Sequence, residues 1–110
     1  MPLSKRARIE VYLVVDNSAA YKLLLNAIQN EFLSTFGGCT VIRGAKGLYS
    51  SENGSVDADD IDVIYADTPF DSEADFATLS AYTDSLKAAL LKATSEGSIL
   101  IAVHQIFHSV

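Results

Sequence analysis

A strand followed by a helix can be read from residues 8–38, RIEVYLVVDNSAAYKLLLNAIQNEFLSTFGG. Apolar residues recur with a period of two over residues 8–15, which is typical of a β-strand, and the period becomes helical over residues 19–36. Residues 16–18 supply N-cap side chains, and residues 37–38 are glycines, which end a helix by adopting the left-handed conformation at low cost. The predicted core-facing residues are Ile9, Val11, Leu13 and Val15 of the strand and Tyr21, Leu24, Leu25, Ile28 and Phe32 of the helix.

The middle of the chain predicts a long hairpin. Residues 39–43 favour a short strand, and the glycines within residues 44–47 break or bulge it. Residues 50–60 are polar and contain Asn53-Gly54, a signal for a type I′ turn. They lead to a strand over residues 61–66 that alternates again. The residues of that strand predicted to face the helices are Ile61, Val63 and Tyr65.

A second helix and a last strand complete the order β-α-β-β-α-β. Asp71 or Ser72 can cap the helix, Gly97 ends it, and residues 99–107 form the strand. Right-handed crossovers leave one common arrangement for this order, the α+β ferredoxin-like sandwich. We therefore predict that residues 1–110 form a single domain. Its four-stranded antiparallel sheet has both helices on one face, with the first and third strands central.

Composition and charge narrow the possible partners. The chain has 110 residues, 49% of them hydrophobic and 20% charged, as in a globular domain. Its formal charge of -6 argues against a general nucleic-acid or anionic-membrane partner. The charge is uneven, because residues 1–50 hold six basic and three acidic groups and residues 51–110 hold two and eleven. A local basic patch near Arg43 and Lys46 is compatible with this distribution.

Several cofactor and targeting signals are missing from the sequence. The lone Cys39 allows no internal disulfide or Cys-rich zinc site, and its expected place is the core or a sheet edge. No Walker or dinucleotide-binding glycine motif occurs, and the acidic segment does not fit a calcium-binding loop. We expect no cofactor and no metal. Apolar runs are too short for a signal peptide or a membrane span, so we expect a cytoplasmic protein.

The sheet face opposite the helices is predicted to be mostly apolar. A face that only met water would alternate more cleanly to polar residues, so an exposed apolar face of this size indicates a partner. The simplest partner is a second copy, and we predict a homodimer or higher homo-oligomer through this open face. A monomer that covers the face with its own loop and N-terminal arm is the alternative. The residues expected there are Glu10, Tyr12, Val14, Asp62, Ile64, Ala66, Leu100, Ala102, His104 and Ile106.

Two groups of residues are candidates for ligand binding. The Gly44-Ala45-Lys46-Gly47 segment offers free backbone and a cation for an anion, with Arg43 and Tyr49 beside it. A corner in a hairpin explains the same glycines.

The second group is on the predicted open face, where Tyr12, Asp62 and His104 could lie together for proton transfer. A histidine hydrogen-bonded at an interface is the simpler interpretation of His104. His104 and His108 are about 13 Å apart along a strand and cannot share one metal ion within a subunit.

The element order over the whole chain resembles small ferredoxin-like proteins. These include the PII-like regulators, which form trimers, and the dimeric α+β barrel proteins, which pair open sheets face to face. Residues 37–49, GGCTVIRGAKGLY, resemble the helix stop, strand and glycine corner found in such groups. The resemblance implies the fold and self-association, and it transfers no catalytic or ligand residue.

Three functions are compatible with these patterns. The first is a small homo-oligomeric binding or regulatory module with a small-molecule or protein ligand at the subunit junction. The second is a small enzyme of the dimeric α+β barrel kind that uses His104 for proton transfer, alone or with Tyr12 or Asp62. The third is an interaction protein that adds its edge strand or acidic surface to a different partner.

Overall fold

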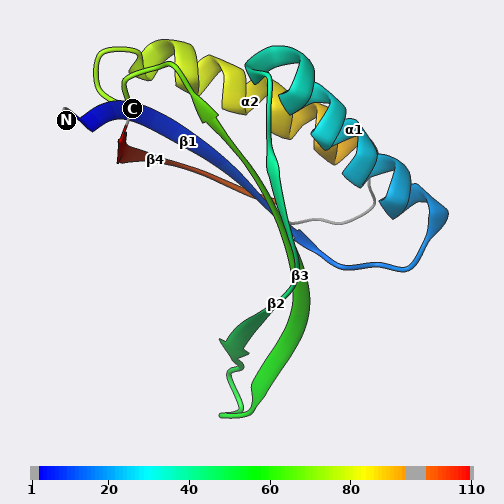
Figure 1. Ribbon diagram of the computed structural model, residues 1–110. Coiled ribbons are helices and arrows are strands. Elements are labelled where there is room, and N and C mark those ends of the chain that lie inside the picture. The colour runs from blue at the N-terminus through cyan, green and yellow to red at the C-terminus, as the bar shows by residue number, and fades with distance from the viewer. Residues whose placement is uncertain (1–2, 94–98, 110) are drawn as a thin grey trace.

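One antiparallel sheet of four strands carries both helices on a single face in the computed structural model, which describes residues 3–93 and 99–109 (Figure 1). The strand order is β2-β3-β1-β4, so β1 and β3 are central. This arrangement confirms the predicted ferredoxin-like βαββαβ fold. The elements are β1 (Leu3–Val14), α1 (Ala19–Phe36), β2 (Thr40–Ser50), β3 (Val56–Thr68), α2 (Phe76–Ala93) and β4 (Leu100–Ser109).

Helix α1 has the bounds that its sequence predicts. The Ser18 hydroxyl accepts a hydrogen bond from the Tyr21 amide at 3.1 Å and so caps the first turn. Gly37 ends the helix with φ of 83°, and its amide donates to the Leu33 carbonyl at 2.9 Å. Local sequence therefore determines both ends of α1.

The start of α2 lies later in the chain than the predicted cap. Asp71 accepts hydrogen bonds from the Glu73 and Ala74 amides, both at 2.9 Å, and these bonds hold the pKa of its carboxyl below its ordinary value. The capped segment is a turn, and the helix begins at Phe76. The predicted end at Gly97 lies outside the described residues.

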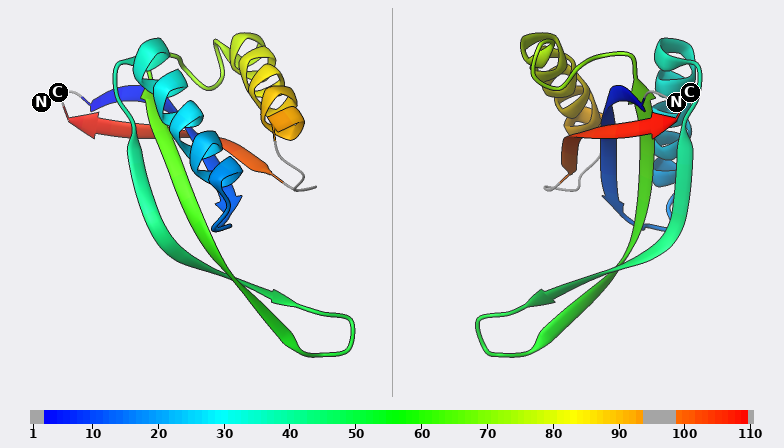
Figure 2. Two further views of the ribbon diagram at one scale, coloured as in Figure 1. Left: turned by 90° about the vertical axis from the view of Figure 1, so that its right-hand side faces the viewer. Right: turned by 60° about the vertical axis from the view of Figure 1, so that its left-hand side comes forward.

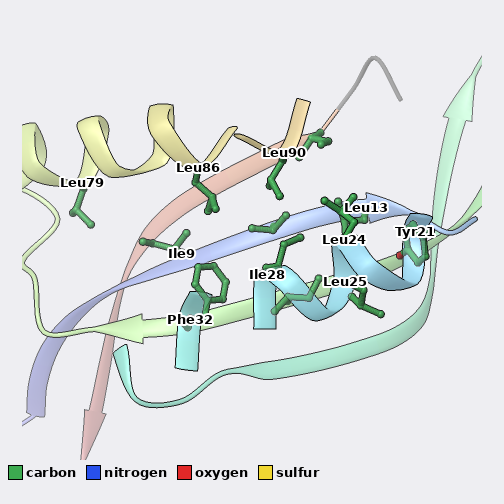
Figure 3. Close-up of a cluster of buried hydrophobic side chains, with 14 of the residues drawn as sticks. Ile9, Leu13, Tyr21, Leu24, Leu25, Ile28, Phe32, Leu79, Leu86 and Leu90 are labelled. Atoms are coloured by element: carbon green, nitrogen blue, oxygen red, sulfur yellow. The ribbon is translucent and has the colours of Figure 1, made fainter. Parts of the chain in front are cut away.

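The core fills the space between the helices and the sheet (Figure 3). Phe32 and Ile28 of α1 are fully buried against Ile9 and Val11 of β1, as the two periodicities predict. Leucines of α2 complete the cluster from the other helix. The buried residues are Ala7, Ile9, Val11, Leu13, Tyr21, Leu24, Leu25, Ile28, Phe32, Ile64, Ala66, Leu79, Leu86, Leu90 and Ile99.

The face prediction for β3 was wrong. Asp62, Ile64 and Ala66 face the helices, because they pair with Leu13, Val11 and Ile9 of β1. Both sides of this strand are rich in apolar residues, so alternation alone did not distinguish them. Asp62 is tolerated on the buried side because the protein supplies it with partners. The residues that take the place of Asp62, Ile64 and Ala66 on the open face are Ile61, Val63 and Tyr65.

The open face has an apolar end and a polar end. The apolar end contains exposed Leu100 and Ile42, together with Tyr12, Val14, Ile61, Val63 and Ala102. The polar end lies where β1 begins and β4 ends. It contains Arg6, Arg8, Glu10, Tyr65, Asp67, His104 and His108.

Strands β2 and β3 continue past the helices as a projecting arm, residues 45–60 (Figure 2). The predicted long hairpin is confirmed, and so is the bulge, which lies between Ile42 and Ala45. The strands extend further than predicted, because residues 56–60 belong to β3 whereas the sequence placed the start of that strand at residue 61. The prediction of a type I′ turn at Asn53-Gly54 was wrong. That turn needs two residues with positive φ, and Gly54 alone has one here, with φ of 84°.

Candidate functional site

A buried carboxylate lies where the arm leaves the body of the protein. The Asp62 side chain is 1% exposed and points from β3 toward α1. Burying a carboxylate is costly unless it is paired and hydrogen-bonded. Tyr21 donates its hydroxyl proton to Asp62 Oδ2 at 2.7 Å, and the Gly44 amide donates to Oδ1 at 3.2 Å. We call Tyr21, Arg43, Gly44 and Asp62 the Asp62 cluster.

The fourth member of the cluster is Arg43, whose Nε lies 3.0 Å from Asp62 Oδ2. The Arg43 side chain is 63% exposed. The buried Asp62 carboxylate therefore positions a guanidinium that solvent can reach. Within residues 3–93 and 99–109, the terminal guanidinium nitrogens of Arg43 form no hydrogen bond. They remain free to donate to a ligand, and a planar guanidinium suits carboxylate and phosphate groups.

Tyr21 keeps its proton over the ordinary pH range. Burial, followed by the hydrogen bond to Asp62, raises the pKa of the Tyr21 phenol well above its usual value. The phenol therefore acts as a hydrogen-bond donor to Asp62. Tyr21 lies at one end of the core cluster, on the first turn of α1 (Figure 3).

A cavity of about 270 Å³ adjoins the cluster between α1, the end of β1 and Arg43. Lys22 provides a second cation there, and Asn17 and Asn26 provide side-chain amides. The one carboxylate of the lining, Asp16, already accepts hydrogen bonds from Ser18. The remaining lining residues are Val15, Tyr21 and Leu25. The cavity combines apolar walls with cationic and amide donors, a set that can hold a small anion.

Of the three residues predicted to line an anion site, only Arg43 borders this cavity. Lys46 forms an exposed ion pair with Asp60 across the arm. Tyr49 lies over Gly47, where an added Cβ would come within 2.6 Å of the Tyr49 hydroxyl and would overlap Ile61. Gly44 therefore allows the backbone of the bulge, and Gly47 leaves room for the side chains that pack on the arm.

The predicted grouping of Tyr12, Asp62 and His104 was also wrong, because Asp62 lies on the other side of the sheet. Tyr12 and His104 do share the open face, where His104 Nε2 lies 2.8 Å from Glu10 Oε1. Burial and the neighbouring Glu10 raise the pKa of Tyr12. His104 is about half exposed on an open surface, and it does not line the cavity beside Arg43.

A second charged group completes the polar end of the open face. Arg8 binds Asp67 through two hydrogen bonds of 2.7 and 3.1 Å. Its guanidinium carbon lies 4.1 Å from the centre of the Tyr65 ring. The bond to Asp67 raises the pKa of Arg8, so the guanidinium stays charged.

Other cavities lie away from the Asp62 cluster. A groove of about 340 Å³ separates the two helices and is mostly apolar, with Tyr82 donating to Glu31 at 2.9 Å on its wall. A cavity of about 290 Å³ lies near Cys39, which packs against the core as predicted. Over residues 3–93 and 99–109, no three His, Cys, Asp or Glu side chains gather closely enough to hold a metal ion. Neither helix, as far as it is described, is both long and apolar enough to cross a membrane.

Sequence reasoning missed the contribution of α1 to the cavity. The helical period of residues 19–36 predicts that Tyr21 lies on the apolar stripe and that Lys22 and Asn26 lie mostly opposite it, whereas all three line the cavity. One signal was present in the sequence. A tyrosine on a buried stripe needs a partner for its hydroxyl, and an aspartate in a strand is the complementary group.

Comparison with known proteins shows the fold. No family model matches the sequence, and no curated protein matches it. The structure is similar to rice (Oryza sativa) CutA1, with a TM-score of 0.56 and 23% identity over 94% of this chain and 84% of that one. It is also similar to the divalent cation tolerance protein CutA1 of Thermus thermophilus, with a TM-score of 0.52 and 14% identity over 91% and 82% of the two chains.

A PII-like protein has the same fold. CPII of Thiomonas intermedia, a nitrogen regulatory PII-like protein, gives a TM-score of 0.53 and 17% identity over 99% of this chain and 100% of that one. This match confirms the predicted resemblance to PII-like proteins at the level of the fold.

Proposed function

We propose that this chain is a small homo-oligomeric binding module with a regulatory role, which holds a small anion in the cavity beside Arg43. The observation that carries the proposal is the pairing of exposed Arg43 with buried Asp62. A surface arginine usually samples many rotamers, and fixing it for a ligand costs entropy. The buried carboxylate reduces that cost because it already holds the guanidinium at the cavity.

The size of the cavity limits the ligand. Ligand pockets for drug-sized molecules range over about 300–1,000 Å³. The volume of about 270 Å³ favours a small metabolite with one or two carboxylate or phosphate groups. CPII, which has the same fold, was solved with ADP, AMP and bicarbonate, all of which are anions at neutral pH.

Self-association is the second part of the proposal. The apolar end of the open face exposes Leu100 and Ile42, at 60% and 47% of their surfaces. The charges of the polar end cancel, because Arg6 and Arg8 oppose Glu10 and Asp67. A face whose charges balance and whose other end is apolar, on a chain of net charge -6, favours a second copy over other partners.

An NMR titration tests the anion site. Inorganic phosphate and succinate are added separately to the ¹⁵N-labelled protein, so that the two chemistries are compared. We expect the largest amide shifts at Asn17, Lys22, Asn26 and Gly44. Shifts centred on the arm or on the open face, or no saturable shifts, would contradict the site.

Light scattering tests the association. We expect a molar mass that is a multiple of the chain mass of 11.8 kDa. Leu100→Glu places a charge in the apolar end and should yield the monomer. Leu48→Glu is the matched control, since Leu48 is a similarly exposed leucine on the arm. A monomeric wild type, or equal effects of the two substitutions, would contradict association through the open face.

A further inference from the structure

Two histidines lie on the open face of β4 and make opposite kinds of contact. His108 Nε2 accepts a hydrogen bond from Arg6 Nε at 2.6 Å. His104 Nε2 lies 2.8 Å from a carboxylate oxygen of Glu10. One imidazole therefore faces a cation and the other faces an anion.

The contact of His108 requires a neutral ring. A histidine nitrogen accepts a hydrogen bond only while it carries no proton, and Arg6 always donates. Protonation of His108 would remove the acceptor and place an imidazolium beside a guanidinium. His104 differs, because its Nε2 lies beside a carboxylate oxygen of Glu10, and a protonated ring would form an ion pair there.

The other groups that face these histidines come from β1 and β3. Strand β1 supplies Arg6, Arg8 and Glu10, and β3 supplies Tyr65 and Asp67. Both helices lie on the opposite face of the sheet (Figure 1). With neutral histidines the two arginines balance the two carboxylates. Among the residues that the structure describes on this face, protonating both histidines would therefore give each copy a net charge of about +2.

We infer that acid weakens self-association through the open face and that His108 is the main sensor. This inference rests on the association proposed above. Histidine is the side chain that ordinarily changes charge between pH 5 and 8. Like charges on two apposed faces repel strongly once water is excluded between them. Glu10 would partly neutralise a proton on His104, whereas no carboxylate of residues 3–93 and 99–109 forms an ion pair with His108.

The dissociation constant of the oligomer at pH 7.5 and pH 5.5, measured by sedimentation, tests the inference. We expect it to rise at least about tenfold at the lower pH in the wild type. In His108→Gln the rise should shrink to about twofold, since glutamine can accept from Arg6 and does not titrate. The matched variant His104→Gln should retain most of the rise. Circular dichroism at both pH values confirms that each variant is folded.

The outcomes separate the two proposals. A wild type that is monomeric at pH 7.5 contradicts the proposed association, and the inferred acid response is then contradicted as well. An oligomer with the same dissociation constant at both pH values overturns the acid response alone. An acid response that persists in His108→Gln and disappears in His104→Gln overturns the assignment of the sensor.

Discussion

Two ion pairs between the same strands behave differently because of where they lie. Arg43 pairs with Asp62 at the junction of the arm and the body, and Lys46 pairs with Asp60 on the arm itself. The first carboxylate is 1% exposed and has two further hydrogen-bond donors, whereas the second is 56% exposed. The comparison shows that burial of one partner converts a common surface pair into a positioned group.

The largest expected difference between these pairs is in stability. Asp62→Ala leaves the Tyr21 hydroxyl and the Gly44 amide without their acceptor, and it should lower the free energy of unfolding by about 3 kcal/mol. Asp60→Ala removes an exposed pair and should lower it by less than about 0.5 kcal/mol. Urea denaturation measures both. Equal losses of unfolding free energy in the two variants would show that the burial of Asp62 does not strengthen its contribution to stability.

A smaller loss is expected when one donor of the Asp62 cluster is removed. Tyr21→Phe keeps the ring in the core but takes one hydrogen bond from a buried charge, so it should cost about 2 kcal/mol. Tyr82→Phe is the matched control, since its hydroxyl donates to the less buried Glu31. The same urea experiment should give a loss below about 1 kcal/mol there. A larger loss for Tyr82→Phe would contradict the special role of Tyr21.

Alkaline pH should weaken the folded state through these two phenols. Burial raises the pKa of Tyr21 and of Tyr82 above 10.0, first through desolvation and then through their carboxylate partners. The folded chain therefore binds these protons more tightly than the unfolded chain does. The resulting stabilisation is complete below pH 10 and is lost as the pH rises through the folded-state values. Thermal unfolding at pH 9 and pH 11 should show a smaller decrease in Tyr21→Phe than in the wild type.

A smaller loss of stability than at Asp62 or Tyr21 is expected from the backbone of the bulge. Gly44 has φ of 76° and open space around it, so Gly44→Ala meets conformational strain alone and should cost about 1 kcal/mol. Gly54 at the tip of the arm has a similar φ of 84° and similar space. Because the tip can rearrange without disturbing the body, Gly54→Ala should cost less in the same denaturation assay. A larger loss of stability for Gly54→Ala than for Gly44→Ala would show that the strained backbone lies at the tip of the arm.

The body of the fold could be predicted from sequence because its signals are local. Ser18 and Gly37 fix both ends of α1, and Ile9, Val11 and Leu13 mark the buried face of β1. The hairpin of the arm was predicted, but the full length of its strands was not, since Asp57, Asp59 and Asp60 have low strand propensity. Cross-strand pairing with β2 holds them extended.

The candidate site was predicted only in part. The sequence indicated both Arg43 and Asp62 as candidates but placed them in different groups. Successive residues of a strand point to opposite faces of the sheet, so an error of one residue in the alternation puts a side chain on the wrong face. The hydrogen bond from Tyr21 shows which face of β3 Asp62 occupies, and Tyr21 lies 41 residues from Asp62 in sequence. Cavities of this kind depend on long-range packing, which local patterns do not carry.

The most direct test of the proposed anion site is the affinity for a small anion when each cation is removed in turn. Calorimetry with inorganic phosphate and with succinate would compare Arg43→Gln with Lys46→Gln, since both cations are exposed members of a β2–β3 ion pair. We expect Arg43→Gln to weaken binding of the preferred anion at least about tenfold and Lys46→Gln to change it by less than about twofold. Equal effects, or an unchanged affinity in Arg43→Gln, would contradict the claim that buried Asp62 positions Arg43 for a ligand.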